Sequence, residues 1–120
     1  MRYLVALILC LSPLPASADP PVVENVRAEQ QGDGWRFDVT ISHPDTGWEH
    51  YADAWRVLDM DGNELGLRIL AHPHVDEQPF TRSLSVVEIP EDVTMVEVEA
   101  RCLVDGWSGV RTRVELDRIK

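Results

Sequence analysis

The sequence predicts an all-β fold: a sandwich of about seven antiparallel strands, preceded by a signal peptide. Apolar and polar residues alternate over several short segments, which is the period expected when one face of a strand is buried. Residues that favour turns separate these segments roughly every ten positions, as is typical of sandwiches. No stretch keeps the apolar spacing of an amphipathic helix, so a helical fold is excluded.

Residues 1–18 have the organisation of a secretory signal peptide. The basic Arg2 precedes the apolar run Tyr3–Leu11, which is too short to span a bilayer as a helix. Residues 16–18, Ala-Ser-Ala, form a small-residue cleavage site. We therefore expect residues 19–120 to form one β-sandwich domain. The protein is expected to be periplasmic or secreted, with no membrane span after cleavage.

The two cysteines bear on the compartment and on stability. Cys10 ends the apolar run, as a lipid-attachment cysteine does, but the bulky Leu9 before it fits lipoprotein processing badly. We therefore expect no lipid anchor. Only Cys102 remains after cleavage, so no internal disulfide can form despite the oxidising destination. Stability is then expected to come from packing alone.

The chain is strongly acidic. It has 11 basic and 21 acidic side chains, a net charge of −10 with neutral histidines. Loss of Arg2 with the signal peptide makes the charge one unit more negative. Such a charge repels phosphate backbones and anionic lipids, so nucleic acids and membrane surfaces are excluded as partners. A protein partner or a metal ion fits the charge better.

The predicted strands are 22–29, 35–43, 48–58, 64–71, 81–89, 95–103 and 110–116. Residues predicted to face inward are Trp35, Phe37, Val39 and Ile41 in the second strand, Leu84 and Val86 in the fifth, and Val96, Val98, Ala100 and Cys102 in the sixth. Leu65, Leu67 and Ile69 share one phase, as do Val110, Thr112, Val114 and Leu116. The third strand leaves two phases open, with either Trp55 and Val57 or Ala54 and Leu58 inside.

The pattern resembles small secreted bacterial proteins with an immunoglobulin-like or fibronectin type III-like fold. The resemblance covers Val22–Leu116 and rests on strand count, on Trp55 in the third strand, and on the hairpin-linked ending. The phrase His-Pro-His-x-x-Glu-Gln-Pro-Phe-Thr-Arg at 72–82 is similar to that of an uncharacterised family of such proteins. The resemblance implies no known activity. The immunoglobulin disulfide is absent, because Cys102 has no partner.

Three connections are predicted to share one end of the sandwich: residues 43–50, 72–80 and 104–109. All four histidines, His43, His50, His72 and His74, lie in the first two of these connections, and the turns at the opposite end have none. Scaffolds commonly present functional residues on loops. We therefore predict a non-enzymatic binding module that uses this end. Its binding surface is predicted to include Trp48, Asp76, Glu77, Arg82 and Trp107.

A metal site is the alternative use of the histidines. Proline makes His72-Pro73-His74 extended, so the two imidazoles project to the same side. Together with His43 or His50 they are candidate ligands for copper or zinc. The competing interpretation is that the histidines only hydrogen-bond the loop backbone. Cys102 has a suitable sulfur, but its strand phase predicts a small core hydrophobe.

The remaining alternatives are structural. Trp48 and Trp107 form either core contacts or an exposed platform, and Arg82 either pairs with Asp76 or Glu77 or binds an anion. The domain is also a candidate accessory module that pairs through an edge strand. An enzyme is not expected. The sequence has no H-E-x-x-H motif, no phosphate-binding glycine loop and no recognisable catalytic triad.

Overall fold

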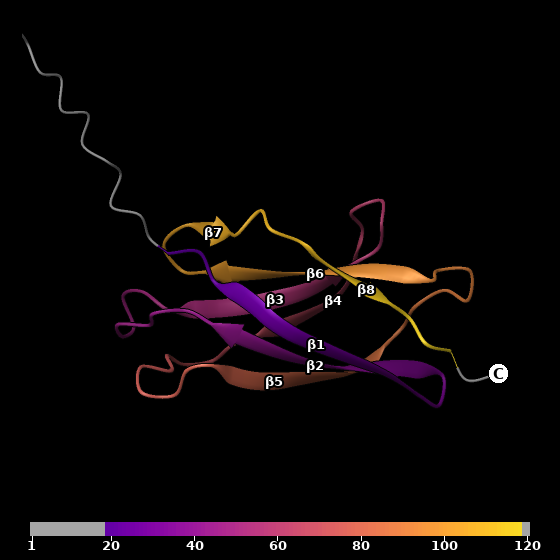
Figure 1. Ribbon diagram of the computed structural model, residues 1–120, viewed down its shortest axis with the longest axis horizontal. Helices are drawn as coiled ribbons and strands as arrows, with labels where there is room; N and C mark the ends of the chain where they lie inside the picture. Colours follow the sequence, from indigo (N-terminus) through magenta and orange to yellow (C-terminus); the bar gives the residue numbers. More distant parts are fainter. Residues whose placement is uncertain (1–18, 119–120) are drawn as a thin grey trace, which may run out of the picture.

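The computed structural model describes residues 19–118, which form a β-sandwich (Figure 1). Its strands are β1 (Val22–Gln31), β2 (Gly34–Ser42), β3 (Ala52–Leu58), β4 (Glu64–Ile69), β5 (Phe80–Val87), β6 (Met95–Cys102), β7 (Gly106–Trp107) and β8 (Thr112–Glu115). The predicted all-β fold class is confirmed. No helix within residues 19–118 is long and apolar enough to cross a membrane.

The strands form two antiparallel sheets. One sheet has the order β1-β2-β5. The other has the order β4-β3-β6-β7, and β8 also pairs with β6, beyond the short β7. The strands run back and forth along the long axis of the molecule. Successive connections therefore lie alternately at its two ends (Figure 1).

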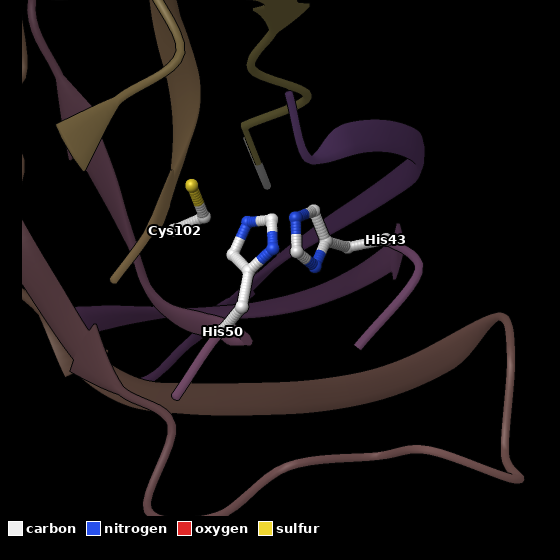
Figure 2. Close-up of side chains that lie close together, drawn as sticks. All are labelled: His43, His50 and Cys102. Atoms are coloured by element: carbon white, nitrogen blue, oxygen red, sulfur yellow. The ribbon is translucent and has the colours of Figure 1, made fainter. Parts of the chain in front are cut away.

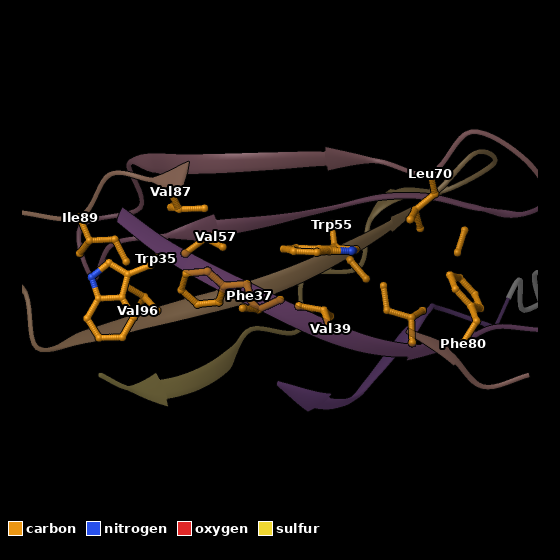
Figure 3. Close-up of a cluster of buried hydrophobic side chains, with 14 residues drawn as sticks. Trp35, Phe37, Val39, Trp55, Val57, Leu70, Phe80, Val87, Ile89 and Val96 are labelled. Atoms are coloured by element: carbon orange, nitrogen blue, oxygen red, sulfur yellow. The ribbon is translucent and has the colours of Figure 1, made fainter. Parts of the chain in front are cut away.

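The core lies between the sheets and is centred on β2, β3 and β6 (Figure 3). The four residues of β2 predicted to face inward are at most 1% exposed. The four predicted in β6 are fully buried. Both of these predictions are confirmed. In β3 residues of both open phases are buried: Trp55 and Val57 join the core cluster, and Ala54 and Leu58 are also covered. The pairing of β3 shifts between Ala52 and Ala54 and between Val57 and Leu58, which interrupts its alternation.

Strand β5 departs from its predicted alternation at Val86. Val86 is 78% exposed rather than inward, and it has a positive φ of 60°. The pairing between β2 and β5 shifts between Trp35 and Phe37, which marks a bulge. The extra residue turns Val86 outward and places Val87 in the core instead. Leu84 packs against the core as predicted.

Two edge regions also differ from the prediction. The expected last strand 110–116 is shorter, since β8 begins at Thr112 and Val110 is 65% exposed. The short β7 precedes it, so residues 104–109 are not only a loop. In the edge strand β4, Leu65 packs against the core, whereas Leu67 and Ile69 are exposed.

The predicted grouping of three connections at one end is confirmed. The β2–β3, β4–β5 and β6–β7 connections lie together at the left of Figure 1. Hydrogen bonds join them: His74 N donates to Asp45 Oδ2 at 2.8 Å, and Leu103 N donates to Tyr51 O at 2.9 Å. We call this end the histidine end. It is defined by residues 43–51, 70–79 and 103–105.

Candidate metal centre

Three side chains that can bind metal meet at the histidine end: His43, His50 and Cys102 (Figure 2). One ligand atom from each lies within 4.8 Å of the others. His43 directly follows β2, His50 lies in the β2–β3 connection, and Cys102 is the last residue of β6. The cluster therefore joins the two sheets at the point where their strands end.

The β2–β3 connection folds back on itself, which brings His50 against His43. Thr46 N donates to His50 O at 3.0 Å, and His50 N donates to Gly47 O at 3.2 Å. Gly47 has φ of 152°, and a Cβ there would lie 2.7 Å from a Glu49 carboxylate oxygen. The resulting turn places the two imidazole rings edge to face, with centroids 4.7 Å apart.

Asp45 fixes the orientation of His43. Its Oδ1 accepts hydrogen bonds from His43 Nδ1 at 2.6 Å and from Ala52 N at 2.9 Å. Its Oδ2 accepts from His74 N. In the neutral ring, a proton on Nδ1 leaves the lone pair on Nε2. A carboxylate behind an imidazole is the usual support of a metal-binding histidine.

Two buried nitrogens of the cluster lack hydrogen-bond partners: His43 Nε2 and His50 Nε2. A buried polar atom without a partner costs about 1–3 kcal/mol. Cys102, fully buried, accepts a hydrogen bond from Asp105 N at 3.3 Å. The cluster thus offers two imidazole nitrogens that lack hydrogen-bond partners and one sulfur that is hydrogen-bonded to Asp105. A metal ion bound there would give both nitrogens a partner.

The donor chemistry selects a class of ion. Imidazole and thiolate suit zinc and copper, whereas magnesium and calcium prefer oxygen ligands. Zinc binds nitrogen at about 2.0–2.1 Å and sulfur at about 2.3 Å, so ligand atoms around one ion lie roughly 3.3–3.6 Å apart. The 4.8 Å spread therefore has to shrink by little more than an ångström.

The structure separates His72 and His74 from this cluster. Their rings contact each other, with centroids 4.6 Å apart, and His74 stacks on Phe80. Arg82 Nη2 lies 2.8 Å from His74 Nε2 and donates to it. Burial, followed by the positive charge of Arg82, lowers the pKa of His74 and keeps its ring neutral. Metal binding by His72 and His74 stays a prediction, but Nε2 of His74 is already hydrogen-bonded to the Arg82 guanidinium.

The predicted binding-surface residues are dispersed over this end. Trp48 is 65% exposed and contacts Tyr51, whereas Trp107 is half-buried beneath Arg56 and Arg101. Asp76 and Glu77 are exposed. Arg82 Nη2 lies 3.7 Å from Glu77, which is the ion pair expected of a loop tether.

Sequence reasoning missed Cys102 as a partner of the histidines. Its inward phase is right, since the side chain is fully buried. However, it is the last residue of β6, and at the end of a strand the core borders the loops that carry His43 and His50. One signal in the sequence could have indicated this contact. Cys102 is the last inward residue of its strand, at the end of the sandwich that carries the histidines.

The comparisons with known proteins give one informative relative. The chain is 39% identical over 88 residues to a protein of Halomicrobium mukohataei named "Putative lipoprotein". The match covers 73% of this chain but 43% of the relative, so the chain spans less than half of the relative's length. No protein-family description and no solved structure matches the chain. The relative is thus a longer protein whose name says only that it is a lipoprotein.

Proposed function

We propose that this protein is an exported, non-enzymatic metal-binding protein that holds one zinc or copper ion at His43, His50 and Cys102. The observation that carries the proposal is the convergence of these ligand atoms within 4.8 Å, with both imidazole Nε2 atoms buried and unpartnered. The Asp45 carboxylate behind His43 supports it, because it presents the free lone pair of the ring to the cluster.

Metal titration of protein purified without an affinity tag tests the proposal. After chelator treatment, calorimetry at pH 7.5 is expected to show binding of one ion per chain. His43→Ala, His50→Ala and Cys102→Ser should each abolish tight binding, because each removes one of three ligands. His72→Ala is the matched control, since it removes an exposed imidazole from the same end and should bind as the wild type does.

Circular dichroism of each variant separates loss of binding from loss of fold. Absence of stoichiometric binding by the wild type contradicts the proposal. Equal losses in His72→Ala and His43→Ala also contradict it, because they place the ion on the other histidine pair.

Export is the second part of the proposal. Residues 1–18 lie outside the described residues, and their sequence supports a cleaved signal peptide. The relative's name, a lipoprotein, also supports export. We expect the mature protein to begin at Asp19 in the periplasm or the medium, which intact-mass measurement checks. A mass that corresponds to a diacylated chain beginning at Cys10 contradicts cleavage before Asp19 and establishes a lipid anchor.

A binding module for a protein partner at the same end is the second candidate function. Trp48, Val75 and Val104, from three different connections, are 65%, 52% and 58% exposed. We propose that the sandwich is of the immunoglobulin-like or fibronectin type III-like form, in which loops at one end commonly bind partners. Crosslinking in periplasmic extract should give a partner that Trp48→Ala loses. Unchanged crosslinking contradicts this function and leaves metal binding unaffected.

A further inference from the structure

Asp105 stands beside the metal cluster on the β6–β7 turn, three residues after Cys102. Its backbone N donates to Cys102 Sγ at 3.3 Å. Its carboxylate Oδ2 accepts from the Cys102 thiol, with Sγ and Oδ2 3.6 Å apart. The turn therefore brings an anionic oxygen directly to the sulfur of the cluster.

The Sγ–Oδ2 distance matches that of two ligands on one tetrahedral ion. Zinc binds sulfur at about 2.3 Å and carboxylate oxygen at about 2.0–2.2 Å, so the two atoms lie roughly 3.5–3.7 Å apart around it. Cys102 and Asp105 are already at this separation. Asp105 lies outside the group of ligand atoms that are within 4.8 Å of one another, so its side chain has to move toward the two imidazoles to share an ion with them.

We propose that Asp105 is the fourth ligand and that the centre is a closed, four-coordinate zinc site made of His43, His50, Cys102 and Asp105. This inference rests on the proposed metal-binding function and deepens it. On loading, the Cys102 thiol releases its proton to solvent. The ion takes the place of that proton between Sγ and Oδ2, and no oxidation or reduction accompanies the step.

Charge supports zinc over copper(I). One thiolate and one carboxylate contribute two negative charges, which a divalent cation neutralises. Cys102 is fully buried, and pairing its thiolate with a cation avoids the cost of desolvating an unpaired charge. Copper(I) leaves one negative charge uncompensated, and it prefers soft donors to a carboxylate. Copper(II) prefers tetragonal nitrogen and oxygen ligation, whereas this set contains a thiolate.

The backbone holds the two ligand-bearing segments in register. Leu103 N donates to Tyr51 O at 2.9 Å, and this bond joins the residue after Cys102 to the residue after His50. The two ligand pairs, His43 with His50 and Cys102 with Asp105, therefore come from anchored segments. Four protein ligands leave no position for a reactive water, which fits a site that holds an ion rather than one that activates water.

Cobalt substitution and zinc competition test the role of Asp105. The full-length mature protein loaded with Co²⁺ is expected to show the intense visible absorption of four-coordinate cobalt together with a thiolate charge-transfer band. Asp105→Asn should keep the charge-transfer band but weaken the visible absorption, because water molecules that replace the carboxylate raise the coordination number above four. Its zinc affinity should fall at least about tenfold. Asp33→Asn, at an exposed carboxylate between β1 and β2, is the control and should behave as the wild type does.

The outcomes separate this inference from the proposed function. If Asp105→Asn matches the wild type in spectrum and zinc affinity while Cys102→Ser loses binding, the fourth-ligand assignment is wrong and metal binding stands. If the wild type binds copper(I) but not zinc, the assignment of the ion is wrong. If the wild type binds neither ion, both proposals fail.

Discussion

Asp45 faces three hydrogen-bond donors: the imidazole Nδ1–H of His43 and the backbone N–H groups of Ala52 and His74. The side chains of Asp45 and His43 are both fully buried. All three of these partners donate. Both oxygens of the Asp45 side chain must therefore accept, which a carboxylate does and an amide does not. A single side chain thus orients one proposed metal ligand and also ties the β4–β5 connection to the β2–β3 connection.

Asp45→Asn is expected to weaken both metal binding and folding. The amide NH2 meets a donor whichever way it is turned, so at least one buried N–H loses its partner, at a cost of about 1–3 kcal/mol. Loss of the carboxylate behind His43 should lower metal affinity by about 10–100-fold. Urea denaturation and zinc titration measure the two effects, with Glu49→Gln on the exposed part of the same loop as the control. Unchanged affinity in a folded variant contradicts the role given to Asp45.

At the scale of the element, the bulge in β5 arises from how the strand pairs with β2 and not from its amino-acid composition. Val86 adopts a positive φ, which β-branched residues rarely do, and its side chain makes little use of the position because it is 78% exposed. Gly34 lies opposite, and a Cβ there would approach Val86 Cα to 3.1 Å. The two backbones are therefore close at this point of the sheet.

Val86→Gly is expected to stabilise the protein by about 1 kcal/mol, because glycine adopts a positive φ without strain. Urea denaturation monitored by tryptophan fluorescence measures the change. Val75→Gly is the matched control: Val75 is an exposed loop valine without a positive φ, so the substitution should give no gain. A loss of stability in Val86→Gly would show that the strand geometry at the bulge is not strained.

The sequence predicts strands best where one face is buried and the alternation is uninterrupted. Residues Trp35 to Ile41 of β2 satisfy this condition, and all of the predicted inward residues are buried. The outward turn of Val86 depends on how β5 pairs with β2. The alternation of apolar and polar residues in one strand does not predict its pairing register. The same limit applies to Cys102. Its phase predicts burial, but which loop side chains it touches depends on the meeting of segments about 60 residues apart.

At the scale of the whole molecule, the grouping of connections was predictable because antiparallel strands send alternate connections to alternate ends. Which histidines meet within that end was not predictable. His43 and His50 lie seven positions apart and are joined by a compact turn, whereas His74 is drawn under Arg82 and onto Phe80. The sequence thus indicated the end at which the four histidines gather, and side-chain packing divides them into two groups.

The His74 group makes stability depend on pH. Burial and the neighbouring Arg82 and His72 lower the pKa of His74 in the folded state, so the unfolded chain binds the proton more readily. Stability is therefore expected to fall as pH drops through the ordinary histidine range, roughly from 7.5 to 5.5. Urea denaturation of the metal-free protein across this range measures it, and His74→Gln should show a weaker dependence. An identical pH profile for the variant contradicts this assignment.

The proximity of Cys102 to the two histidines, with ligand atoms within 4.8 Å of one another, has a consequence for the unfolded chain as well. His43 and Cys102 are about 60 residues apart in sequence, so an ion bound to both acts as a reversible cross-link across most of the domain. Closing a loop of that length removes conformational entropy worth about 4 kcal/mol from the unfolded state when the link is permanent. If the protein is exported and binds metal as proposed, the ion would stabilise a chain with a single cysteine in the way that a disulfide stabilises other exported domains.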